Sequence, residues 1–122
     1  MISVSPCFDK EKLKELYLKS GTEFSDKSVA VLAESSGEVL GFCLFDLYEN
    51  SALIKKIEPE NDIMLADGIL RSALHVAAER FITEVRYEKS IFGIVDKLKF
   101  VKDKNECTLD IDKLFKSCKS CK

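Results

Sequence analysis

The chain has 122 residues, of which 46% are hydrophobic and 33% are charged, and its formal net charge is −2. This balance is typical of one globular domain with a single core and excludes a disordered or fibrous chain. Acidic and basic residues are interspersed, so we expect no basic face of the kind that nucleic acid requires. The apolar runs are too short to span a bilayer, and the N-terminus lacks a signal-peptide pattern. We therefore expect a cytoplasmic protein that contacts neither nucleic acid nor membrane.

The five cysteines do not predict a disulfide framework, because their number is odd and their spacing is irregular. Cys118 and Cys121 form a C-x-x-C in the final segment, which suggests half a zinc site or a redox pair. Zinc requires four ligands, however, and the sequence has no second C-x-x-C or C-x-x-H. We favour a loose tail with two thiols and no metal, and we predict a single domain over residues 1–114 followed by a polar tail over residues 115–122.

The first part of the chain predicts a strand followed by an amphipathic helix. Residues 2–5 alternate between apolar and polar side chains, which is typical of a strand. Asp9 can cap the helix that follows, an apolar stripe repeats along that helix, and Gly21 can end it.

The middle of the chain predicts three strands joined by tight turns. The strands cover residues 28–35, 39–48 and 52–59, with turns at 35–38 and 49–51. The second strand is apolar at nearly every position from residue 39 to residue 45. Such a strand is typical of the centre of a sheet that is covered on both faces.

A long amphipathic helix is predicted next, over residues 66–81. Its apolar residues recur at spacings of three and four and form one wide face. Two i,i+4 pairs on the polar side, Asp67 with Arg71 and His75 with Glu79, would support it modestly. A solvated role as the partner of Glu79 is expected for His75, rather than a role as a ligand.

The remaining elements are a strand at 83–87, a shorter helix within 89–100 and a last strand at 106–111. The predicted order is therefore β-α-β-β-β-α-β-α-β. Three strands in a meander followed by two βα crossovers imply an α/β (α+β) domain, with a mixed, mostly antiparallel sheet and helices on both of its faces.

Several segments in this order resemble the GCN5-related N-acetyltransferase (GNAT) family. The hairpin "GEVLGFCLFDL", the strand end "IEP", the helix "DGILRSALHVAAER" and the segment "VDKLKF" are similar to the corresponding parts of that family. The resemblance covers about residues 2–111. It implies an acyl-CoA N-acyltransferase-like fold, acetyl-CoA as cosubstrate, and acetyl transfer to an unidentified small-molecule or peptide amine.

The resemblance also implies where the cosubstrate would bind. In the family, the pantetheine arm lies between a fourth and a fifth strand that diverge, and the loop after the fourth strand binds the pyrophosphate through backbone N–H groups at a helix start. The residues that match this site are Ile57, Ala66, Asp67, Gly68, Ile69, Leu70 and Arg71.

This sequence departs from the family's loop, which reads Arg/Gln-x-x-Gly-x-Gly/Ala. Only Gly68 remains, whereas Leu65 and Leu70 replace the basic and the second small residue. Asp67 brings a negative charge toward a bound anion, which costs roughly 1 to 4 kcal/mol at about 4 Å depending on screening. Arg71 could offset that charge. Gly68, in the predicted first turn, would let the backbone approach a phosphate closely.

The catalytic residues of the family are poorly matched. Where the resemblance implies a tyrosine that protonates the departing thiolate, this chain has Val95, and Lys99 replaces a glycine. Glu58 is the carboxylate on the predicted fourth strand and a weak candidate for a base. Two hypotheses follow: a small acetyl-CoA-dependent N-acyltransferase, or a non-catalytic module that keeps the fold for binding or assembly. Diverging strands expose pairing edges, so a homodimer fits either hypothesis.

Overall fold

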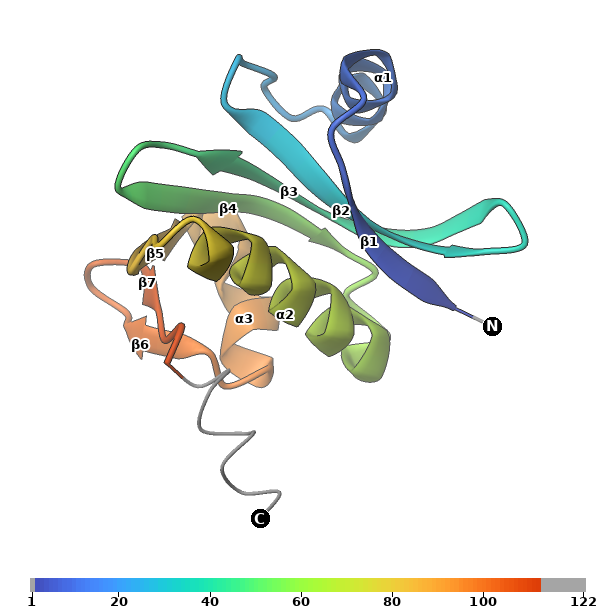
Figure 1. The fold of residues 1–122 in the computed structure, drawn as a ribbon. Helices are drawn as coiled ribbons and strands as arrows, with labels where there is room; N and C mark the ends of the chain where they lie inside the picture. The colour runs from blue at the N-terminus through green and yellow to red at the C-terminus, as the bar shows by residue number, and fades with distance from the viewer. Residues whose placement is uncertain (1, 113–122) are drawn as a thin grey trace.

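The computed structural model describes residues 2–112, which form one seven-stranded sheet with helices on both faces (Figure 1). The strands lie in the order β1-β2-β3-β4-β5-β7-β6, and every neighbouring pair is antiparallel except β4–β5. This arrangement confirms the predicted fold class. The elements are β1 (Ser3–Cys7), α1 (Lys10–Ser20), β2 (Ser28–Ser35), β3 (Glu38–Leu47), β4 (Ser51–Glu58), α2 (Ile63–Glu79), β5 (Glu84–Tyr87), the 3-10 helix η1 (Lys89–Ile91), α3 (Phe92–Lys97), β6 (Val101–Asp103) and β7 (Thr108–Leu109).

Local signals in the sequence set the first elements. The Asp9 side chain accepts hydrogen bonds from the N–H groups of Glu11 and Lys12, and Gly21 ends α1 in a left-handed conformation with φ 71°. Both caps were predicted. The β2–β3 hairpin turns at Ser36 and Gly37, which have φ values of 52° and 81°. Two positive φ angles in a two-residue turn match the right-handed twist of the paired strands.

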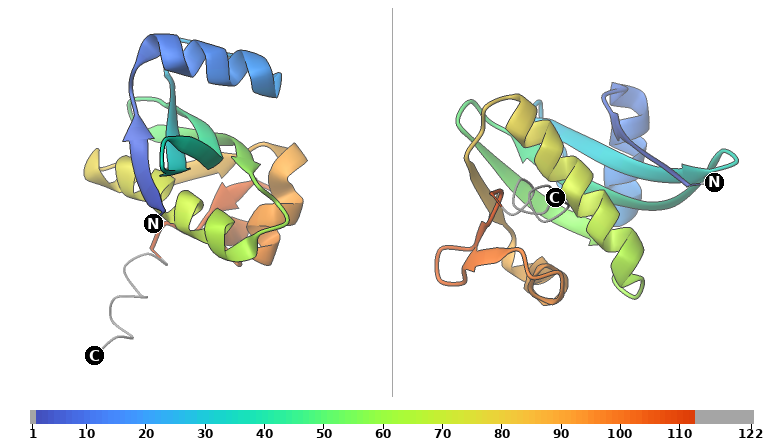
Figure 2. Two further views of the ribbon diagram at one scale, coloured as in Figure 1. Left: turned by 90° about the vertical axis from the view of Figure 1, so that its right-hand side faces the viewer. Right: turned by 60° about the horizontal axis from the view of Figure 1, so that its bottom comes forward.

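The two faces of the sheet carry two separate apolar clusters. α2 packs against one face in the larger cluster, which includes Cys43 and Phe45 of β3. α1 covers the other face through Leu13 and Tyr17, which pack against Leu44 of the same strand. Successive side chains of β3 therefore enter different cores, as the period of two requires. The prediction that β3 is a central strand covered on both sides is confirmed, and Figure 2 shows α1 and α2 on opposite sides of the sheet.

α2 begins earlier than the sequence indicated. It starts at Ile63 rather than at residue 66, because Asp62 acts as its N-cap and accepts a hydrogen bond from the N–H of Leu65 at 3.1 Å. The first bond along the helix axis runs from Ala66 N to Asp62 O at 2.9 Å. Gly68 therefore lies in the second turn, and its predicted place in the first turn is wrong.

A close approach fixes the start of α2 and the end of β4 against β3. A Cβ built on Gly41 would lie 2.6 Å from the backbone oxygen of Glu58 and 2.8 Å from side-chain atoms of Pro59 and Ile69. No other residue type fits such a space without movement of the backbone. Gly41 thus allows three elements to meet beside the candidate site.

The C-terminal part contains one strand more than predicted. β6 lies between α3 and the last strand, and it pairs with β7 at the edge of the sheet. The predicted last strand at 106–111 is only Thr108–Leu109, because the turn after β6 takes up the residues before it. None of the helices within residues 2–112 is long and apolar enough to cross a membrane. The predicted tail, with Cys118 and Cys121, lies outside the described residues.

Candidate active site at the β4–β5 split

The strands β4 and β5 pair along only part of their length. The parallel register joins Ser51–Ile54 of β4 to Glu84–Tyr87 of β5, and the N–H of Glu88 donates the next bond to the carbonyl of Ile54 at 2.9 Å. β4 then continues to Glu58 beside β3. Within residues 2–112, the second half of β4 has no strand partner on its β5 side. Figure 1 shows β5 beside the first part of β4 only.

A β-bulge lies at the point where the two strands part. In the β3–β4 register, Leu44 pairs with Lys56 and Phe45 pairs with Ile54, so Lys55 is an extra residue on β4. A bulge bends its strand and increases the local twist. Its position next to Ile54, the last residue of β4 that pairs with β5, accounts for the divergence of the two strands.

The side chains beyond the bulge point to different faces. Ile57 is fully buried in the core under α2. Glu58, the next residue, lies on the opposite face, where its carboxylate is 3.8 Å from the ammonium of Lys56 and its side chain is 41% exposed. The weak candidate base is thus accessible to solvent, and it lies at the far end of β4 from the point where β5 parts from it.

Half of the predicted phosphate-binding segment, residues 66–71, belongs to the core. The side chains of Ala66, Ile69 and Leu70 are fully buried in the cluster beneath the sheet. Because these residues follow the first turn of α2, their N–H groups bond within the helix. The open donors belong instead to the first turn, beside the carboxylate of Asp62. Whether the segment contacts a cofactor stays a prediction.

The predicted ion pair on α2 is present. Arg71 Nε lies 2.8 Å from Asp67 Oδ2, and the guanidinium lies 5.1 Å from the ring centroid of Phe100. Arg71 therefore compensates the charge of Asp67, as expected. The second predicted pair is not formed: His75 is exposed, and no ion pair within residues 2–112 joins it to Glu79.

Sequence reasoning missed a buried polar cluster that begins at the bulge. Lys55 Nζ lies 2.8 Å from Asp46 Oδ1 of β3, and both side chains are only 8% exposed. The ammonium also donates to the carbonyl of Glu23 at 2.7 Å, and Asp46 accepts from the hydroxyls of Ser28 at 2.7 Å and Tyr48 at 3.2 Å. The cluster fastens the segment between α1 and β2 to the face of β4. Nothing in the sequence marked it, since Lys55 stood as one of two adjacent lysines.

Tyr17 closes this cluster from α1. Its hydroxyl donates to the carbonyl of Val29 at 2.6 Å, and the ammonium of Lys55 lies 4.7 Å from its ring centroid. Burial raises the pKa of Tyr17 well above its ordinary value, and the nearby charge of Asp46 raises it further. The phenol therefore stays protonated and acts as a fixed donor.

The position that resembles the family's catalytic tyrosine holds Val95, which is fully buried in the core. It cannot donate a proton. Another tyrosine, Tyr87, lies on β5 opposite Ile54 in the last paired position. The sequence indicated only that Tyr87 ends the predicted strand at 83–87, and no local signal could have placed it at the split.

Solved structures with a similar fold show which family shares this geometry. No family model matches the chain, and no curated protein matches it in sequence. In structure it is similar to Tetrahymena GCN5 with a TM-score of 0.61 and 10% identity, over 79% of this chain and 77% of that one. It is also similar to the ribosomal-protein-S18-alanine N-acetyltransferase of Escherichia coli, with a TM-score of 0.59, 9% identity and 88% of each chain covered.

A GNAT family acetyltransferase from Streptococcus pneumoniae is similar too, with a TM-score of 0.54 and 16% identity over 82% of this chain and 87% of that one. Identities this low carry information on the fold and not on the reaction. The strand order, the parallel β4–β5 pair that parts after Ile54, and these structural neighbours together establish that the chain has the fold of the GCN5-related N-acetyltransferases.

Proposed function

We propose that this protein is an acetyl-CoA-dependent N-acyltransferase that acetylates a small-molecule or peptide amine in the cytoplasm. The observation that supports the proposal is the edge of β4 over residues 55–58, which has no strand partner on the β5 side within residues 2–112. An open strand edge offers a row of N–H and C=O groups. An extended ligand that contains amide groups can pair with such an edge as an added strand would. The pantetheine arm of acetyl-CoA has this chemistry.

The end of β4 leads directly toward the start of α2. Ile63 and Met64 are the first residues of that helix, and within the helix their N–H groups have no partner four residues earlier. Helix starts attract anions through these donors and through the positive end of the helix dipole. A pantetheine arm along β4 would therefore carry its pyrophosphate to this end of α2. The carboxylate of Asp62 opposes that approach, because it repels an anion at the same donors.

Acetyl transfer from a thioester to an amine does not require a strong acid or base from the protein. The nitrogen of a neutral amine attacks the thioester carbonyl, the C–N bond forms as the C–S bond breaks, and CoA leaves as a thiol or thiolate while the amine loses one proton. Holding the amine against the thioester can supply most of the acceleration. Glu58 is exposed and could accept the proton through water. Val95 rules out an acid at the position where the family resemblance implied a tyrosine.

Calorimetric titration with acetyl-CoA tests binding, and Asp62→Asn sharpens the test. Asparagine caps a helix about as well as aspartate, so the helix start is kept while its charge is removed. If the pyrophosphate binds there, affinity should rise about fivefold, since one like charge near 4 Å costs about 1 kcal/mol in water. The matched control is Asp9→Asn, which changes the equivalent cap of α1 and should leave the affinity unchanged.

Three outcomes separate the ideas. Binding that Asp62→Asn strengthens supports the proposed placement of the cosubstrate. If acetyl-CoA binds with the same affinity to both variants, it is still the cosubstrate, but its phosphates do not bind at the start of α2. Absence of binding at millimolar acetyl-CoA rejects the transferase. If acetyl-CoA binds, mass spectrometry of amine mixtures incubated with the chain would detect acetylated products.

The alternative is a non-catalytic module that uses the same fold for binding or assembly. Two observations favour it: Val95 replaces a tyrosine in the core, and Asp62 places a negative charge at the helix start. A chain that binds acetyl-CoA but acetylates no amine would fit this alternative. A homodimer is proposed under either function, and sedimentation equilibrium would test it.

A further inference from the structure

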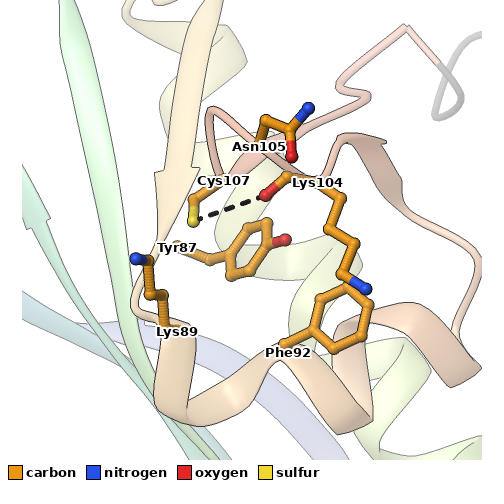
Figure 3. A pocket seen from close by; sticks show the side chains of 6 residues that line it. All are labelled: Tyr87, Lys89, Phe92, Lys104, Asn105 and Cys107. Carbon is orange, nitrogen blue, oxygen red and sulfur yellow. Dashed lines mark hydrogen bonds between the residues drawn. The ribbon is translucent and has the colours of Figure 1, made fainter.

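A cavity lies beside Tyr87, at the end of β5. Its volume is about 350 Å³, within the range of small-ligand sites. It is formed where β5 ends, η1 and α3 begin, and the β6–β7 turn folds over them (Figure 3). The residues that line it are Tyr87, Lys89, Phe92, Lys104, Asn105 and Cys107.

The hydroxyl of Tyr87 has no hydrogen-bond partner within the described residues. Tyr87 is only 3% exposed. Figure 3 shows this hydroxyl on the side of the ring that faces Lys104 and Phe92. Burial raises the pKa of Tyr87, and the Cys107 side chain and the carboxylates of Asp96 and Asp103 raise it further, so the phenol stays protonated. Buried polar groups in native proteins normally have a hydrogen-bond partner. A ligand in this cavity could supply the acceptor that the Tyr87 hydroxyl lacks.

The charged side chains that line the cavity are positive. Of the described residues that line it, two are lysines and none is acidic. Within residues 2–112, neither Lys89 nor Lys104 forms an ion pair, and the ammonium of Lys104 lies 5.0 Å from the ring centroid of Phe92. The carboxylate of Asp103 in the neighbouring turn instead accepts the backbone N–H groups of Asn105 and Glu106 at 2.9 and 3.2 Å.

The β6–β7 turn holds this arrangement in place. Besides the bonds to Asp103, the carbonyl of Cys107 accepts the N–H of Tyr87 at 2.9 Å, which ties the turn to the end of β5. Cys107 itself has a φ of 54°, a conformation that residues other than glycine and asparagine seldom adopt. Strained backbone of this kind persists where the surroundings hold it, and it concentrates at binding sites.

We infer that this cavity binds a small organic carboxylate with an apolar body. The rings of Tyr87 and Phe92, whose centroids are 6.3 Å apart at an interplanar angle of 31°, offer an apolar surface. The Tyr87 hydroxyl and the Lys104 ammonium lie on the same side of the Tyr87 ring and offer a donor and positive charge for the carboxylate, and Lys89 adds positive charge from the other side of that ring (Figure 3). The site goes beyond the proposed acyl transfer, and its test requires no acetyl-CoA, so either proposal can fail alone.

Benzoate is a suitable probe, because it joins a carboxylate to an aromatic ring of the right size. In a ¹H–¹⁵N NMR titration of the full chain, benzoate should shift the amide signals of Lys89, Asn105 and Cys107, with a dissociation constant of about 1–10 mM for so small a ligand. Benzamide has the same shape without the charge, and inorganic phosphate has charge without the apolar body. Both should bind at least about tenfold more weakly.

Variants locate the binding. The double variant Lys89→Gln and Lys104→Gln should weaken benzoate at least about tenfold, whereas Lys102→Gln, an exposed lysine of β6 outside the cavity, should not change it. Tyr87→Phe should weaken benzoate severalfold without loss of the folded spectrum, because it removes only an unpartnered hydroxyl.

The inference is overturned by any of three results. The first is that benzoate shifts none of the cavity's amide signals at 50-fold the concentration of the chain. The second is that benzamide or phosphate binds as tightly as benzoate. The third is that Lys102→Gln weakens benzoate as much as the double lysine variant does, which would mean that the charge of the chain as a whole attracts the anion.

Discussion

The buried ion pair of Lys55 and Asp46, on the face of the sheet that α1 covers, should contribute strongly to the free energy of unfolding. Lys55→Met keeps the length of the side chain and removes its charge, so Asp46 is left with two hydroxyl donors and no cation. Both side chains are 8% exposed, and the N–O distance is 2.8 Å, so little water can replace the lost ammonium. Removal of one partner of such a pair costs about 3–5 kcal/mol. The variant also releases the carbonyl of Glu23, which Lys55 holds at 2.7 Å.

Urea denaturation at pH 7 measures this free energy, with an unchanged m-value as the sign that two-state unfolding persists. The next residue provides the control. Lys56 forms an ion pair with Glu58 at 3.8 Å, and these side chains are 33% and 41% exposed, so Lys56→Met should cost less than about 1 kcal/mol. If the two variants lose the same stability within about 1 kcal/mol, burial does not strengthen the Lys55 interaction and the reasoning fails.

Other predictions concern the two glycines of the site, Tyr17 and Cys43. Gly41→Ala should destabilise the fold by about 1–3 kcal/mol in the same urea assay, because its Cβ would lie 2.6 Å from a backbone oxygen at the end of β4. Gly68→Ala should instead stabilise it by up to about 1 kcal/mol, since a Cβ there meets nothing within 4 Å, and a loss would contradict the helical placement. Tyr17→Phe should cost about 1–3 kcal/mol through the carbonyl left without its 2.6 Å donor, and a neutral result would mean that water takes its place. Burial raises the pKa of Cys43, so peptide mass spectrometry after brief alkylation at pH 8 should find Cys43 intact and Cys107 modified; equal labelling would refute its burial.

Structural features that depend on a few neighbouring residues were predicted from the sequence. Asp9 and Gly21 delimit α1, and the turn at Ser36 and Gly37 joins β2 to β3, because caps and tight turns depend on the conformational preferences of single residues. The all-apolar run in β3 indicated a strand with a core on each side. The resemblance to the GNAT fold, based on segments in the right order, is confirmed by the solved structures.

The first residue of α2 was not predicted correctly from local sequence signals. Asp62 is a good N-cap, yet the predicted helix began at residue 66 with Gly68 in its first turn, whereas Gly68 lies in the second turn. A glycine is a weak marker in this context, because a helix interior tolerates it at a cost of about 1 kcal/mol. The alignment of a family motif on one residue therefore moved the expected phosphate site away from the true helix start.

By itself, the sequence determined the order of the elements up to α3 and the central place of β3, since these follow from periodicity and from single-residue preferences, but it did not indicate β6. Only the tertiary structure decided where β5 parts from β4, that Lys55 bulges toward Asp46, and that Tyr87 closes a cavity with the β6–β7 turn. Each of these depends on strand register, and register brings together residues that are distant in the chain. A shift of one residue would turn every side chain of a strand to the opposite face, so contacts of this kind are set by the packing of the whole sheet.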